Sequence, residues 1–149
     1  MPSTFLLILS NLVLSAILTG LIWTIQLVHY PGFLRVGIDN FLEYQHTHMR
    51  TISYLVIPLM LSELALGIML QVAHWRQPMH SLVYWATTSL LVVWLSTWFV
   101  SSPLHGKLAQ TGFDKMTIQQ LVSTNWIRTV AWSFRTGILF YITWWLYNR

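Results

Sequence analysis

The chain has no cysteine and few charged residues. Without cysteine it cannot form a disulfide, a thiolate metal site or an iron–sulfur cluster, so any metal must bind histidine, methionine or carboxylate side chains. Only 8% of the 149 residues are charged and 55% are hydrophobic, with a mean hydropathy of +0.57. Because so few charges cannot cover a soluble surface, the composition predicts a membrane protein.

Several sequence motifs that are typical of soluble enzymes and metal-binding proteins are also missing. There is no phosphate-binding loop, nucleophile elbow or cysteine-based metal knuckle. The net charge of +4 is spread thinly, with no run of Lys or Arg that would follow a nucleic-acid backbone. We therefore expect a lipid bilayer, and no nucleic acid, among the partners.

Four apolar segments are long enough to cross a hydrocarbon layer of roughly 30 Å, which takes about 20 helical residues. They cover residues 4–28, 51–73, 82–100 and 129–147. Backbone groups in lipid must be hydrogen-bonded internally, so these segments are predicted to be helices. We expect an all-α polytopic membrane protein, a four-transmembrane-helix bundle that forms a single transmembrane domain over residues 1–149.

Two stretches of the chain resemble each other. Arg50-Thr51-Ile52-Ser53-Tyr54 and Arg128-Thr129-Val130-Ala131-Trp132 each open an apolar segment, and a Gly-x-Asp precedes each of them. This internal repeat predicts two repeated helical hairpins, over residues of about 4–73 and about 82–148. His29 and His105 would then hold equivalent places in the two hairpins.

Two capping patterns predict where the second and fourth helices begin. Asn40 with Glu43, and Thr117 with Gln120, fit the capping box, so helix starts are expected near residues 41 and 118. Each helix would run for about 30 residues, or roughly 45 Å, and would extend beyond the bilayer core. The opposite connection, residues 73–81, is expected to be an interfacial turn with solvated His74 and His80.

Basic residues favour one membrane orientation. The connections between the first and second and the third and fourth segments hold Arg35, Arg50, Lys107, Lys115 and Arg128, whereas the other side has Arg76 and Arg149. The positive-inside rule places the richer side in the cytoplasm. We expect a protein of the bacterial inner membrane with both termini in the periplasm.

Four histidines fall near one membrane face and suggest a cofactor. His29 and His105 are candidate ligands of a haem, and together with His46 and His48 they are candidate ligands of a transition metal, iron or copper. His46 and His48 lie about 200° apart on a helix, so both cannot face one ligand. Two alternatives are open: the histidines contact lipid headgroups at helix ends, or they transfer protons.

Four ionisable residues are candidates for catalysis or substrate positioning: Arg50, Glu63, Arg128 and Arg135. Glu63 and Arg135 lie deep in apolar segments, where a charge is costly and normally faces the bundle interior. They form either a structural ion pair between the second and fourth helices or part of a polar pocket for substrate or protons.

A polar stripe is predicted on the fourth helix. Asn125, Arg128, Trp132 and Arg135 follow one another at intervals of three, four and three residues, so they share a face that should point inward. With Arg50 and Lys107 this stripe would make a basic funnel for a carboxylate or phosphate. Contact of Arg50 and Arg128 with lipid headgroups is the alternative.

Short motifs in all four helices resemble the four-helix bacterial membrane proteins that oxidise protoporphyrinogen. They are Gly20-Leu21 with Trp23, Arg50 with Pro58 and Met60, Lys107 to Gln110, and Asn125 to Thr129. The resemblance implies a helical bundle with a redox cofactor. That family is expected to have a haem-ligating His early in the first helix and a Lys in the third; here Ser10 and Asn11 stand near the first place and the third segment has no Lys, so its site does not carry over.

Small four-helix proteins grouped with anthrone oxygenases are a similar match. The sequence thus suggests a small membrane oxidoreductase that binds haem or a metal and acts on a lipophilic or anionic substrate. The alternative is a non-catalytic accessory or assembly subunit of a larger membrane complex. A homo-oligomer is a further possible assembly.

Overall fold

The computed structural model describes residues 2–73 and 79–148, and all regular structure in this part of the chain is helical. The first half consists of α1 (Pro2–Thr24), the π-helix η1 (Ile25–His29), α2 (Tyr30–Gly32), the 3₁₀ turns η2 (Phe33–Arg35) and η3 (Ile38–Asn40), and α3 (Phe41–Ala73). The second half consists of α4 (His80–Ser96), the π-helix η4 (Thr97–Ser101), α5 (Ser102–Thr111) and α6 (Lys115–Tyr147). The predicted all-α class is confirmed.

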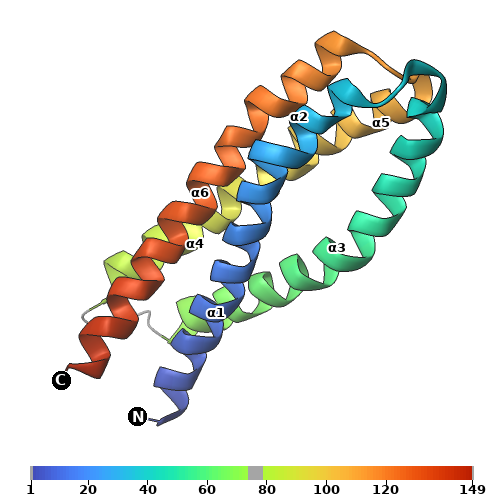
Figure 1. Ribbon diagram of the computed structural model, residues 1–149. Coiled ribbons are helices and arrows are strands. Elements are labelled where there is room, and N and C mark those ends of the chain that lie inside the picture. The colour runs from blue at the N-terminus through green and yellow to red at the C-terminus, as the bar shows by residue number, and fades with distance from the viewer. Residues whose placement is uncertain (1, 74–78, 149) are drawn as a thin grey trace.

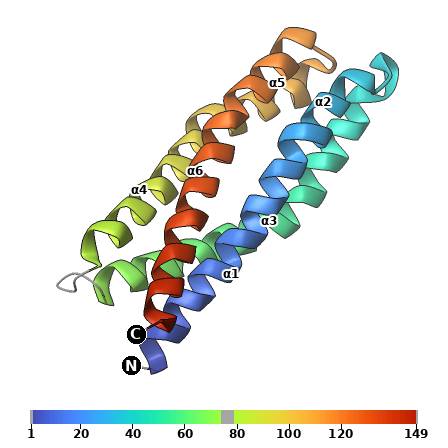
Figure 2. The same ribbon diagram turned by 60° about the vertical axis from the view of Figure 1, so that its left-hand side comes forward.

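These elements form four long helical segments that lie side by side (Figures 1 and 2). The connections from α2 to α3 and from α5 to α6 meet at one end of the molecule, and both termini lie at the other (Figure 1). Ring contact between Phe41 and Phe113, with centroids 5.5 Å apart, joins the two connections. Chain regions distant in sequence therefore share this end.

Three of the four segments are long and apolar enough to cross a membrane. They are Thr4–Arg35, Ile38–Ala73 and His80–Thr111. This finding rests on length and composition and agrees with an integral membrane protein. The span predicted on α6 is outside this set, so a fourth span stays a prediction.

The first and third segments each contain a π-helix that ends two residues before a proline. The N–H of Tyr30 bonds to the carbonyl of Ile25, and the N–H of Ser102 bonds to the carbonyl of Thr97. The next residues, Pro31 and Pro103, have no N–H to continue the ladder, so a wider turn before each proline keeps the helix continuous. Each π-helix is followed directly by a short helix, α2 in the first half and α5 in the second.

Helix α6 begins at Lys115, not near residue 118, because its cap is not Thr117. Asp114 is the N-cap, and its Oδ1 accepts from the N–H of Met116 at 3.1 Å. Thr117 donates its hydroxyl to Oδ2 of Asp114 at 2.6 Å. Gly112 ends α5 with a positive φ of 76°, a conformation that glycine adopts at no steric cost. The predicted start of α3, near residue 41, agrees with its start at Phe41.

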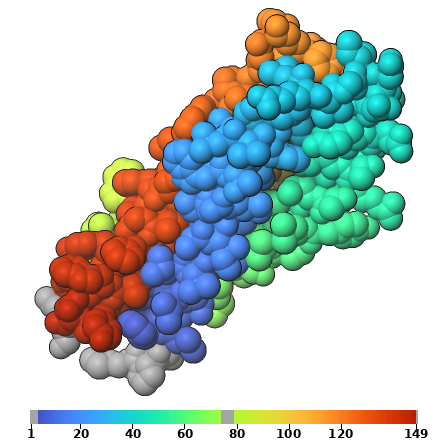
Figure 3. Space-filling view, viewed as in Figure 1, coloured from blue at the N-terminus to red at the C-terminus, as the bar shows by residue number. Residues whose placement is uncertain are grey.

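Helix α3 contains Pro58 and curves away from α1 and α6 in its middle (Figure 1). By contrast, α1 and α6 pack against each other along the face shown in Figure 3. Of the expected turn over residues 73–81, His74 lies outside the described residues, and His80 is the first residue of α4. The curvature of α3 leaves space between this helix and the rest of the bundle.

Candidate functional site

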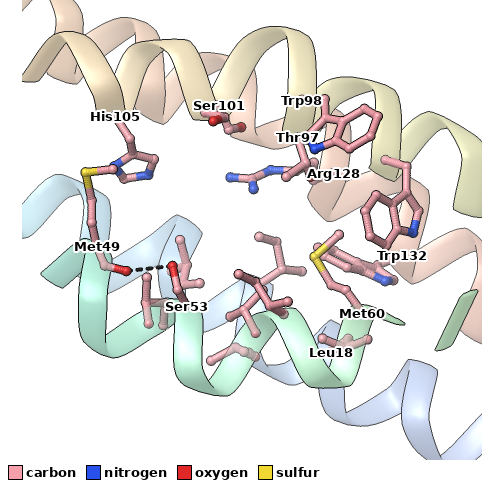
Figure 4. A pocket seen from close by; sticks show the side chains of 18 of the residues that line it. Leu18, Met49, Ser53, Met60, Thr97, Trp98, Ser101, His105, Arg128 and Trp132 are labelled. Carbon is pink, nitrogen blue, oxygen red and sulfur yellow. Dashed lines mark hydrogen bonds between the residues drawn. The ribbon is translucent and has the colours of Figure 1, made fainter. Parts of the chain in front are cut away.

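A pocket of about 420 Å³ lies between α1, α3, η4 and α6. Most of its lining is apolar, and Leu18, Met60 and Trp132 are examples (Figure 4). Polar lining residues gather toward the end where α5 begins: Tyr30, His48, Ser101, Ser102, His105 and Arg128. The pocket is thus amphipathic, with a long apolar part and one polar end.

Arg128 is a buried cation without a carboxylate partner among the described residues. Its side chain is 7% exposed, and Nη2 donates to Oδ1 of Asn125 and, at 3.1 Å, to the hydroxyl of Tyr30. The salt bridges in the described part of the chain are Lys107–Asp114 and Arg135–Glu63, so neither involves Arg128. Nε of Arg128 has no hydrogen-bond partner there. Within residues 2–73 and 79–148 the positive charge therefore has only neutral hydrogen-bond partners.

Asn125 is held in place by Gln26 of η1. Nδ2 of Asn125 donates to Oε1 of Gln26 at 2.8 Å, and Nε2 of Gln26 donates to the carbonyl of Val122 at 3.1 Å. Both amide side chains are buried, and their bonds tie the first π-helix to α6. This network fixes the orientation of the Arg128 guanidinium.

His105 joins the same network through Tyr30. The Tyr30 hydroxyl lies 2.9 Å from Nε2 of His105, and Nε2 of Gln45 lies 3.0 Å from Nδ1 and 3.2 Å from the carbonyl of His105. Because the Gln45 amide nitrogen donates to Nδ1, the proton of a neutral ring is on Nε2 and points to Tyr30. The Tyr30 oxygen then accepts from both His105 and Arg128.

A second imidazole pair lies beside this network. Nε2 of His29 is 3.0 Å from Nδ1 of His48, and the His48 and His105 ring centroids are 5.5 Å apart. The buried ring of Phe33 contacts all three imidazoles at centroid distances of 5.1, 5.3 and 6.2 Å. His46 is exposed on α3. The structure thus brings together three of the four predicted histidines.

The geometry of these histidines does not by itself form a metal centre. Among the described residues no group of three or more His, Asp or Glu side chains could hold a metal ion. Both ring nitrogens of His105 have hydrogen-bond partners within the protein, and so does Nε2 of His29. Haem or metal binding stays a prediction. Aligned on the prolines that follow η1 and η4, His29 precedes Pro31 and His105 follows Pro103, so the two are not in equivalent places.

Glu63 and Arg135 form a fully buried ion pair whose charged groups are bonded within the protein. Both are 0% exposed, and Oε1 of Glu63 lies 2.9 Å from Nε of Arg135. Oε2 of Glu63 accepts from Nε1 of Trp132 at 2.9 Å. The two remaining guanidinium nitrogens of Arg135 donate to the carbonyl of Ala86 and to Oδ1 of Asn11. Neither charged residue lines the pocket, and the geometry fits a structural pair.

The predicted basic funnel takes a different form in the structure. Arg50 is exposed on α3 and is not part of the pocket lining, and Lys107 lies 3.1 Å from Asp114 at the surface. The stripe of Asn125, Arg128, Trp132 and Arg135 is buried, as its spacing predicted. Arg128 is the member of the expected funnel that reaches the pocket.

Sequence reasoning did not select Gln26, Tyr30, Gln45, Trp94 or Ser101. Gln26 was detectable as a polar residue near the end of an apolar segment, where it needs a buried partner. Tyr30 and Ser101 carried no comparable signal, because Tyr and Ser are common at membrane boundaries and in helices.

The fold and the site define an all-helical protein with a largely apolar pocket and hydrogen-bonded polar side chains at one end. No protein-family model, curated protein or solved structure matches the chain.

Proposed function

We propose that this chain is an integral membrane protein that binds a lipophilic molecule taken from the bilayer. In this proposal α6 is the fourth span and the bundle consists of two related hairpins. The 33 residues of α6 correspond to about 50 Å of helix at 1.5 Å per residue, enough to cross the hydrocarbon layer. The protein would lie in a bacterial inner membrane with both termini in the periplasm, as the positive-inside rule suggests.

The observation that carries the proposal is where the pocket opens. Trp98 of η4 lines the pocket and is 67% exposed, and Ile57 and Leu61 of α3 line it and are also exposed. All three are apolar, so in a bilayer they would face acyl chains and not water. An opening with such a rim admits molecules from the lipid phase.

Ligand retention tests the proposal. The purified protein in phosphatidylcholine nanodiscs should retain a lipophilic molecule that mass spectrometry detects after extraction. Met60→Trp should reduce retention, because the larger side chain would occupy the buried pocket wall. Ile68→Trp is the matched control on an exposed position of the same helix. Equal contents in both variants and in empty nanodiscs would favour the alternative, an accessory subunit of a larger complex.

The proximity of three imidazoles favours a second candidate, a redox enzyme with haem, iron or copper. One of the ring nitrogens of His48 is not used in the His29–His48 bond, and His48 lines the pocket. The visible spectrum and metal content of the purified protein test this candidate. A bound metal should be lost in His48→Ala and His105→Ala and kept in His46→Ala. Loss in none of these variants would show that the histidine cluster is not the ligand set.

A further inference from the structure

Two buried hydrogen-bond donors at the polar end of the pocket have no partner among the described residues. They are Nε of Arg128, on α6, and Oγ of Ser101, the last residue of η4. Both residues line the pocket, and they are 7% and 2% exposed. Figure 4 shows the Arg128 guanidinium projecting into the cavity on the side where Ser101 and His105 lie. Buried polar groups are normally hydrogen-bonded, so this pair indicates a missing acceptor.

The chemistry of the two donors restricts that acceptor. A guanidinium can only donate, and its charge strengthens hydrogen bonds to anionic oxygens. The partners of Nη2, Asn125 and Tyr30, are neutral side chains, and the carboxylate of Glu63 is bound to Arg135. The charge of Arg128 is therefore not compensated by a described carboxylate.

A third unpartnered donor lies deeper in the pocket. Nε1 of Trp94 is buried without a partner among the described residues, and Trp94 lines the pocket seven positions before Ser101. That separation corresponds to about 10 Å along a helix. Trp94 is thus too far along the axis to share an acceptor with Ser101, and the headgroup is assigned from Arg128 and Ser101 alone.

The volume restricts the rest of the ligand. The pocket holds about 420 Å³, near the lower end of the range of roughly 300–1,000 Å³ for ligand pockets. A two-chain phospholipid would not fit within it, whereas one apolar chain would. The apolar lining formed by residues such as Leu18, Met60 and Trp132 extends from the Arg128 end.

We propose that the pocket binds a single-chain amphiphile with an oxyanion headgroup, a carboxylate or a phosphate, which accepts from Arg128 and Ser101. The assignment rests on the proposed lipophile-binding function and adds the headgroup class. The hydrocarbon chain of the amphiphile lies among the apolar side chains of α1, α3 and α6. With the headgroup at the polar end of the pocket, the anion lies beside Tyr30 and His105, which belong to the hydrogen-bond network of Arg128.

A series of ligands with one chain length tests the headgroup. Dodecanoate, dodecyl phosphate, dodecanol and dodecyltrimethylammonium are titrated into the protein in phosphatidylcholine nanodiscs, with empty nanodiscs subtracted. We expect both anions to bind about tenfold or more tightly than the alcohol and the cation, the effect of charge-assisted hydrogen bonds. Whichever anion binds more tightly distinguishes a free fatty acid from a phosphorylated lipid.

Two variants locate the effect. Arg128→Gln should lower the affinity for the anions to that for dodecanol, and Ser101→Ala should lower it several-fold, with dodecanol binding unchanged in both. Arg50→Gln, at an exposed position outside the pocket, is the control and should bind like the wild type. If Arg128→Gln does not fold, the anion affinity of Ser101→Ala alone tests the headgroup assignment.

The outcomes separate the two proposals. Equal affinity for all four ligands, or preference for the cation, would overturn the oxyanion assignment and leave lipophile binding intact. Unchanged anion binding in Ser101→Ala and Arg128→Gln would also overturn it. Absence of binding by every ligand would overturn both proposals.

Discussion

Oε1 of Glu63 lies 2.9 Å from Nε of Arg135, and both side chains are fully buried. Through this pair and its two other bonds, to Ala86 of α4 and Asn11 of α1, the Arg135 guanidinium links α6 to the three other long helical segments. Arg128, two turns away on the same helix, has no such carboxylate among the described residues. One buried arginine thus serves the architecture, and the other is available to the pocket.

Removal of the negative charge from the Glu63–Arg135 pair should destabilise the bundle. Glu63→Gln leaves a buried guanidinium without a counter-charge, and breaking a buried pair in this way costs about 3–5 kcal/mol. The thermal unfolding midpoint in detergent, followed by the helical circular dichroism signal, measures the loss. Glu43→Gln, at an exposed position of α3, is the control. A loss equal to that of the control would contradict the structural role.

Gly67 should not tolerate a methyl group. A Cβ there would lie 2.8 Å from Cδ2 of Leu90 and 3.4 Å from Nη2 of Arg135, so the buried Leu90 side chain or the helices that hold it would have to shift. Overpacking of this kind costs about 1–3 kcal/mol. Gly20→Ala is the matched control, because an added Cβ there would meet no atom within 4 Å beyond its chain neighbours and the backbone of its own helix. The unfolding midpoint of Gly67→Ala should be lower than that of Gly20→Ala. A midpoint for Gly67→Ala equal to or above that of Gly20→Ala would contradict the packing at Gly67.

Tyr30→Phe should affect both stability and the headgroup end of the pocket. The substitution leaves Nη2 of Arg128 and Nε2 of His105 without their shared acceptor, and an unsatisfied buried group costs about 1–3 kcal/mol. Tyr54→Phe, at an exposed position of α3, removes a hydroxyl without this effect. Unfolding midpoints of the two variants measure the difference. Equal midpoints would show that the Tyr30 hydroxyl does not hold the network.

The start of α6 should weaken in acid. The Thr117 hydroxyl, followed by the Lys107 ammonium, lowers the pKa of Asp114 from 3.8 to about 2. Because the folded-state pKa is the lower one, the stabilisation is complete above the unfolded value of 3.8 and is lost as the pH falls through about 2. The difference in unfolding midpoint between wild type and Asp114→Asn should therefore shrink over this window. A difference that stays constant would contradict the pKa shift.

Part of the fold follows from residue spacing. The apolar segments predicted the long helices, and the intervals between Asn125, Arg128, Trp132 and Arg135 predicted their shared buried face, because helical periodicity is a local property. The start of α6 was predicted incorrectly, since Thr117 and Asp114 are both plausible caps and only the backbone geometry selects one. The π-helices were also not predicted, although Pro31 and Pro103 mark their positions.

The candidate site depended on tertiary structure to a greater degree. Arg50 and Arg128 begin the same sequence motif, yet one is exposed and the other buried, because Arg50 is on the face of α3 away from the pocket whereas Arg128 is on the buried stripe of α6. The partners of Arg128 come from α2 and from a neighbouring turn of α6, and those of His105 from α2 and α3. No spacing rule connects residues that far apart in the chain.

By itself, the sequence determined the helical class, the long apolar helices and the scarcity of charge, because these depend on composition and on the 3.6-residue period. Tertiary structure decided which charges are neutralised. Glu63 reaches Arg135 and not Arg128, so the Arg135 guanidinium is paired within the core. In the part of the chain that the structure describes, Nε of Arg128 has no partner and lies beside a largely apolar pocket. Charge pairing depends on distances of a few ångströms between helices, which only their packing sets.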